Sequence, residues 1–208
     1  MGTRNLICVM KDNEYKVAQY AQWDGYPNGQ GLDVLKFLHS YNKEKFLQNL
    51  DKYIKFGTDD QIQDQWVQCG SDGSEWVDSS VSNKHSKLFP ENSRDTGAKI
   101  FNIIAKTKKN LLLQNSVTFA ADSLFCEWTY VVDFDKNVFE VYEGFNKGKF
   151  DSDGRFAFLV NENEAVLDKL VEEETIYYPV RLIKSFNLDS LPTEEEFLSE
   201  FKDNEDEE

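Results

Sequence analysis

Residues 22–31 are the first candidates for chemistry in this chain. They read Gln-Trp-Asp-Gly-Tyr-Pro-Asn-Gly-Gln-Gly, a loop that combines glycines, aromatics and a carboxylate. Gly29 and Gly31 let backbone N–H groups approach a ligand closely. A helix that begins near Leu32 would add its positive end, so the pattern favours an anion-binding site.

Two interpretations of this loop stay open. In the functional one, Asp24 and Tyr26 select the ligand through hydrogen bonds. In the structural one, Asp24-Gly25 and Pro27-Asn28-Gly29 are consecutive turns, and Trp23 and Tyr26 pack over the neighbouring hairpin.

Glu127 is a second candidate, because it interrupts a predicted strand, residues 124–133, that is largely apolar on both faces. A carboxylate in such a place must be hydrogen-bonded, ion-paired or raised in pKa, as catalytic carboxylates are. Alternatively, this end of the strand is exposed and Glu127 is solvated.

Arg94 is a third candidate, a cation within Ser-Arg-Asp-Thr-Gly just before a predicted helix. It would bind an anion or form a structural ion pair. The residues that we expect to contact a ligand are Arg4, Gln22, Trp23, Asp24, Tyr26, Gly29, Gly31 and Arg94.

Nucleotide and metal motifs of defined spacing are absent. The glycines of the 22–31 loop form neither a P-loop nor a dinucleotide fingerprint. Asp133, Asp135 and Asn137 have the first spacings of a calcium loop, but the glycine and glutamate that complete one are missing, which indicates a hairpin turn. We expect no metal and no cofactor.

An N-terminal hairpin would lead into the loop. Residues 6–10 are apolar at every position, which indicates a strand covered on both faces. Residues 15–23 would be its partner after a turn at Asp12-Asn13.

Helices are predicted after the loop. A short helix is expected at residues 32–38. Residues 43–54 have the apolar spacing of one helical face, and a further helix buries Ile100, Phe101, Ile103 and Ile104. Residues 57–92 are the least regular region, which a lid, an insertion or a long surface loop would all explain.

The second half of the chain predicts another hairpin and a C-terminal helix. The expected elements are strands at 124–133, 138–143 and 177–186, a helix at 164–172, and a last helix opened by the capping box Thr193-Glu194-Glu195-Glu196. The chain should thus be one α+β domain over residues 1–202, a layered sandwich of antiparallel hairpins covered by helices. An acidic, disordered tail is expected at 203–208.

Composition limits the partners. There are 38 acidic and 23 basic residues, a net charge of −15. This balance argues against non-specific nucleic-acid binding. It fits a solvated acidic face, a basic protein partner or imitation of a polyanion.

The cysteines and the apolar runs indicate a compartment. Cys8, Cys69 and Cys126 are odd in number and form no C-x-x-C pair, which favours a reducing environment. No run is long enough for a membrane span or a secretory signal. We expect a soluble cytoplasmic protein with no membrane partner.

Several of these segments resemble a family of uncharacterised proteins from bacteria, phages and fungi. Members begin Met-Gly-Thr-Arg and carry Gln-aromatic-Asp-Gly-Tyr-Pro-x-Gly-x-Gly, as residues 1–4 and 22–31 do here. Residues 93–98 and 126–130 are also similar. The resemblance brings no established activity with it.

A second, weaker resemblance is to N-terminal-nucleophile hydrolases of the cholylglycine hydrolase and penicillin V acylase group. It implies a sandwich of two sheets between helices and a catalytic role for Asp24 near the end of the hairpin. Gly2 stands where those enzymes have their cysteine, so Thr3 would be the nucleophile only if Gly2 were also removed. The candidate catalytic residues are therefore Thr3, Asp24 and Glu127.

Three functions follow as hypotheses. The leading one is binding of a small polar or anionic ligand at the corner where hairpin, loop and helix meet. The second is an N-terminal-nucleophile-type amidohydrolase. The third is a phage-type acidic protein that binds and inhibits a basic host protein.

Overall fold

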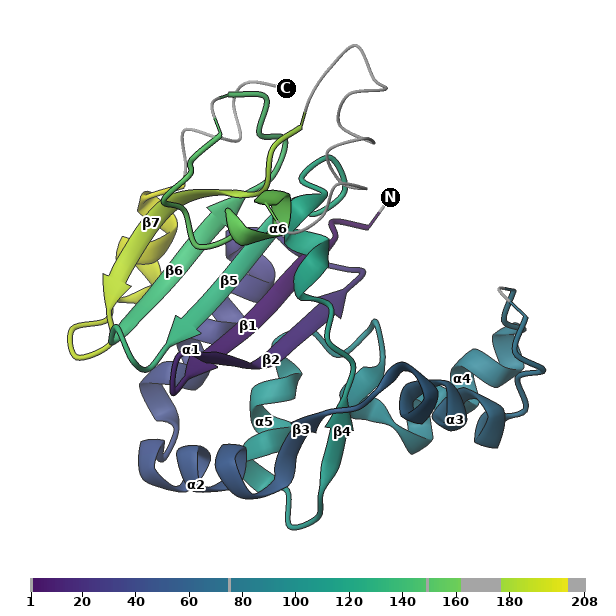
Figure 1. Ribbon diagram of the computed structural model, residues 1–208. Coiled ribbons are helices and arrows are strands. Elements are labelled where there is room, and N and C mark those ends of the chain that lie inside the picture. Colours follow the sequence, from purple (N-terminus) through teal and green to yellow (C-terminus); the bar gives the residue numbers. More distant parts are fainter. Residues whose placement is uncertain (1, 75, 149, 162–176, 202–208) are drawn as a thin grey trace.

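The computed structural model describes residues 2–74, 76–148, 150–161 and 177–201 (Figure 1). Its centre is a five-stranded sheet of order β2-β1-β5-β6-β7. The strands are β1 (Asn5–Lys11), β2 (Glu14–Ala21), β5 (Trp128–Asp133), β6 (Val138–Glu143) and β7 (Arg181–Asn187). β1 and β5 are parallel and the other neighbours are antiparallel, so the sheet is mixed. The predicted α+β layered fold is confirmed.

Apolar residues cover both faces of this sheet. One cluster joins Ile7, Tyr130 and Val141 to four helices: α1 (Leu32–Ser40), α2 (Lys43–Tyr53), α5 (Lys99–Lys106) and α8 (Glu194–Ser199). On the opposite face, Leu6, Cys8 and Val131 lie in a second cluster with residues of η3 (Val117–Ala121) and α6 (Phe158–Asn161). β1 is therefore buried on both faces, as its continuous apolar run predicts.

A smaller unit stands beside the edge strand β2. β3 (Ile54–Phe56) and β4 (Leu111–Leu113) pair in parallel, and the helical hairpin of α3 (Asp59–Cys69) and α4 (Ser79–Leu88) projects beyond them (Figure 1). The short helix η2 (Pro90–Asn92) returns the chain to the sheet.

The expectation of an irregular region at 57–92 is wrong, because α3 and α4 fill much of it. α3 begins with a capping box between Thr58 and Gln61 and ends at Gly70, whose φ of +106° closes the helix. Its buried residues are few and include Gln65, so the apolar periodicity that reveals most helices is weak here.

Other boundaries differ modestly from prediction. β2 ends at Ala21 rather than at residue 23, and β7 begins at Arg181 rather than at residue 177. The helix expected at 164–172 and the tail at 203–208 lie outside the described residues.

The described elements do not include the two stacked sheets implied by the hydrolase resemblance, since the second sheet has only two strands. No helix within the described ranges is long and apolar enough to cross a bilayer.

Candidate functional site

The 22–31 loop forms a helical turn that runs directly into α1. η1 (Pro27–Gly31) is a π-helical turn, and the Leu32 N–H donates to the carbonyls of Pro27 and Gly29. The Gly29 N–H donates to Tyr26 O (3.0 Å). Leu32 is therefore not a free helix N-terminus, and these amide groups are already used within the protein.

The glycines of this loop are explained by close packing. A Cβ at Gly29 would clash with Asp24, and one at Gly31 would lie 2.9 Å from the ring of Tyr130. Asp24 itself has φ +59°, a left-handed conformation that aspartate tolerates. Small residues are needed here whether or not a ligand binds.

Hydrogen bonds join the loop to the ends of the strands. Tyr130 Oη donates to Gly25 O (2.7 Å), and the Gly25 N–H donates to Thr3 O (3.0 Å). Asn5 Nδ2 donates to Trp23 O at 3.2 Å. These bonds support the structural interpretation of the loop, and ligand contacts by Gly29, Gly31 and Asp24 stay a prediction.

The aromatic residues of the loop are about half exposed. Trp23 Nε1 donates to Asp95 Oδ1 (2.8 Å), which connects the loop to the segment before α5. Tyr26 lies near Trp128, with ring centroids 6.5 Å apart. The Gln22 N–H donates to Arg94 O at 2.9 Å.

Glu127 is bonded to the chain beside it. The Arg4 N–H donates to Glu127 Oε1 (3.0 Å), and the Glu127 N–H donates to Arg4 O (3.1 Å). Arg4 Nε lies 3.9 Å from the same carboxylate, and the guanidinium stands 4.5 Å over the ring of Phe125. Arg4 and Glu127 thus serve as partners for each other.

Main-chain contacts bring the candidate catalytic residues to one end of the sheet. Thr3 is buried, and its carbonyl accepts hydrogen bonds from the Gly25 N–H and from Asn5 Nδ2. None of Thr3, Asp24 and Glu127 lines the pocket described next.

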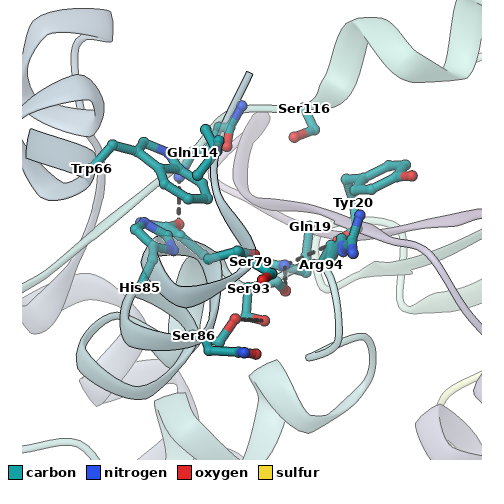
Figure 2. Close-up of a pocket in the computed structure, with 14 residues that line it drawn as sticks. Gln19, Tyr20, Trp66, Ser79, His85, Ser86, Ser93, Arg94, Gln114 and Ser116 are labelled. Atoms are coloured by element: carbon teal, nitrogen blue, oxygen red, sulfur yellow. Dashed lines mark hydrogen bonds between the residues drawn. The ribbon is translucent and has the colours of Figure 1, made fainter. Parts of the chain in front are cut away.

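A pocket of about 430 Å³ lies between the α3–α4 hairpin and the edge of the main sheet (Figure 2). Of the predicted ligand-binding residues, Arg94 is the one that lines it. The lining residues are Gln19, Tyr20, Trp66, Val77, Ser79, Ser82, Asn83, His85, Ser86, Asn92, Ser93, Arg94, Gln114 and Ser116.

The sheet side of this pocket is held in place by hydrogen bonds to residues 92–94. Gln19 Nε2, on β2, donates to Ser93 O (3.1 Å). Asn92 Nδ2 donates to Leu112 O, and the Gln114 N–H donates to Asn92 Oδ1, each at 2.8 Å. Asn92 and Ser93 are held in this way, and the Gln22 N–H donates to Arg94 O, so the main chain that carries Arg94 is fixed as well.

The helical side is organised by a stacked pair. Trp66 of α3 and His85 of α4 lie with ring centroids 3.7 Å apart and planes 4° from parallel. His85 is 1% exposed, and burial lowers the pKa of its imidazole, which keeps the ring neutral at pH 7. Its Nε2 is buried and has no hydrogen-bond partner among the described residues. Ser86 Oγ accepts from Ser93 Oγ at 2.9 Å, which joins α4 to the sheet side.

The charge of the pocket is opposite to that of the whole chain. Its lining contains no Asp or Glu, although the chain has 38 of them. Arg94 is exposed, and no carboxylate in the described part of the chain forms an ion pair with its guanidinium. With His85 neutral, the described lining carries one positive charge among hydroxyl and amide groups.

Within the described residues, no group of three His, Cys, Asp or Glu side chains is arranged to hold a metal ion. Comparisons with protein-family models, with curated proteins and with solved structures each give no match.

Proposed function

We propose that this protein binds a small anionic ligand in the pocket beside Arg94. The observation that carries this proposal is the charge of the lining: one arginine without an acidic partner in the described structure and no carboxylate, in a chain of net charge −15. An anion entering the pocket meets the Arg94 cation and no carboxylate among the lining residues.

The neighbouring groups suit such a ligand. A guanidinium presents paired N–H donors that match a phosphate or a carboxylate. The hydroxyls of Ser79, Ser82 and Ser116 supply further donors. The volume of about 430 Å³ lies within the range of small-molecule sites.

The proposed ligand belongs to the class predicted from the sequence, but its site is the pocket beside Arg94 rather than the 22–31 loop. The loop amides that would have bound an anion at residues 29–32 make hydrogen bonds within the protein. Arg94, predicted from sequence as one of several contacts, becomes the principal one.

The test is calorimetric titration with ribose 5-phosphate, with ribose as the neutral control. We expect the phosphate to bind and ribose not to bind detectably. Arg94→Gln should weaken binding about tenfold or more, since a hydrogen bond to a charged group contributes about 1.5–3 kcal/mol.

Arg181→Gln is the matched control, because Arg181 is an exposed arginine on β7, away from this pocket. It should leave the affinity unchanged. Equal binding of ribose and ribose 5-phosphate, or an unchanged affinity in Arg94→Gln, would contradict the proposal.

A further inference from the structure

The pocket has two chemically different ends. Figure 2 shows Trp66 and His85 at one side and Arg94 with Tyr20 at the other. A ligand that uses both ends needs an anionic group and a separate planar or apolar part.

The aromatic end is a fixed stacking surface. His85 covers one face of the Trp66 indole, with ring centroids 3.7 Å apart, which leaves the opposite face as the one on which a ligand ring would stack. Val77 also lines the pocket and adds a branched apolar side chain. A sugar phosphate alone has no flat ring to use this surface, whereas every nucleobase does.

The carboxamide side chains of Gln114 and Asn83 line the pocket. Gln114 lies beside Trp66 in Figure 2, and Asn83 belongs to the same helix as His85. Within the described structure, neither side-chain amide has a hydrogen-bond partner. A carboxamide offers a donor and an acceptor together, the combination that pairs with the edge of a base.

Resting on the proposed function, we propose that the ligand is a nucleoside monophosphate, whose base stacks on Trp66 while its phosphate binds Arg94. Gln114 then contacts the edge of the base. The selectivity of the pocket thus comes from two ends that act on one ligand.

The experiment compares inorganic phosphate, ribose 5-phosphate and the four ribonucleoside 5′-monophosphates by calorimetric titration. At least one mononucleotide should bind about tenfold or more tightly than ribose 5-phosphate, the effect expected of one stacked base. Trp66→Leu should remove this advantage while leaving the affinity for ribose 5-phosphate within about twofold.

Trp76→Leu is the matched control, since Trp76 is 91% exposed and does not line the pocket. It should keep the nucleotide preference. Gln114→Ala changes an exposed residue and should reduce that preference without unfolding the protein. Trp66→Phe, which retains a ring, should restore part of it.

The outcomes separate the two proposals. Equal binding of ribose 5-phosphate and all four mononucleotides, or a nucleotide preference that survives Trp66→Leu, would overturn the nucleotide inference and leave the anion site standing. Failure of every phosphate to bind, or binding that Arg94→Gln does not weaken, would overturn both.

Discussion

His85 shows how a single side chain links the stability of the pocket wall to pH. Its imidazole is buried against Trp66, and burial lowers its pKa below the ordinary value of 6.5. The folded protein keeps His85 neutral, whereas the unfolded chain protonates it more readily. The free energy of unfolding therefore falls at a pH where the unfolded state binds a proton that the folded state does not.

The first prediction concerns this pH dependence. Above about pH 6.5, His85 is neutral in both the folded and the unfolded state, and its contribution to the free energy of unfolding is fully present. As the pH falls from there toward the lower pKa of the folded state, the unfolded state binds more protons and stability is lost. His85→Phe should show a smaller loss of denaturation midpoint between pH 7.5 and pH 5.5.

His39→Gln provides the comparison. His39 is exposed and bonds to Pro192 O at 2.8 Å. This variant controls for the loss of a histidine at the surface, and a His85→Phe protein with the wild-type slope would contradict the role given to His85.

A second residue-scale prediction concerns the buried arginine of the opposite sheet face. Arg155 Nη2 lies 2.6 Å from Asp133 Oδ2, and its Nε lies 2.7 Å from Glu140 Oε2. All three side chains are less than a tenth exposed. Arg155→Met should lower the free energy of unfolding by about 3–5 kcal/mol, because it leaves two buried carboxylates without their cation.

Chemical denaturation measures this effect, and Arg181→Met is the control. Arg181 bonds Glu143 at 2.7 Å but is 60% exposed, so its ion pair should contribute about 0–1 kcal/mol. Similar losses in the two variants would show that the Arg155 cluster is not specially stabilising.

At the scale of one side chain, the sequence identifies chemistry but not its neighbours. Arg94 stands out in the sequence as a cation just before a helix, and Trp66 stands out as an isolated aromatic residue. Their meeting depends on contacts between distant segments, such as the bond from Gln19 to Ser93. No local pattern encodes such a contact, so the residues that line the pocket together with Arg94 could not be predicted.

Among the elements, the α3–α4 hairpin has the largest effect on the site. It supplies Trp66 and His85, which line the pocket on the side opposite the edge of β2. Its sequence is polar, so its start is marked by capping more than by apolar spacing.

The third prediction tests that cap. Thr58 Oγ1 accepts from the Gln61 N–H at 3.3 Å, and Gln61 Oε1 accepts from the Thr58 N–H at 3.0 Å. Thr58→Ala should reduce stability by about 1 kcal/mol. Hydrogen exchange should quicken first in α3, since its own apolar contacts are few.

Thr118→Ala, a change at an exposed threonine of η3 that caps no helix, serves for comparison. Exchange in α3 should be unaffected by it. Unchanged exchange in α3 of the Thr58→Ala protein would argue that tertiary contacts alone hold the helix.

Element prediction succeeds where burial is strong. The helix at 43–54 and the strand at 138–143 are found at Lys43–Tyr53 and Val138–Glu143, because the helix has a buried face of regular spacing and the strand has four consecutive buried residues. The 22–31 loop is different. Its glycines predict a close approach, but only the structure shows that the approach is to Asp24 and Tyr130.

For the whole molecule, charge is the property that unites the observations. A net charge of −15 repels anions at long range, so an anion site must exclude acidic groups from its immediate surroundings. The pocket beside Arg94 does so within its described lining. The amidohydrolase and basic-partner hypotheses stay predictions, and they place function at other surfaces.

The most direct test is amide chemical-shift mapping during titration with ribose 5-phosphate. A ligand in the pocket beside Arg94 should cause the largest shift changes at Ser93, Arg94 and Gln114, with smaller ones around His85. Changes concentrated at Gly25, Gly29 and Gly31 instead would contradict it, and would return the site to the loop between β2 and α1.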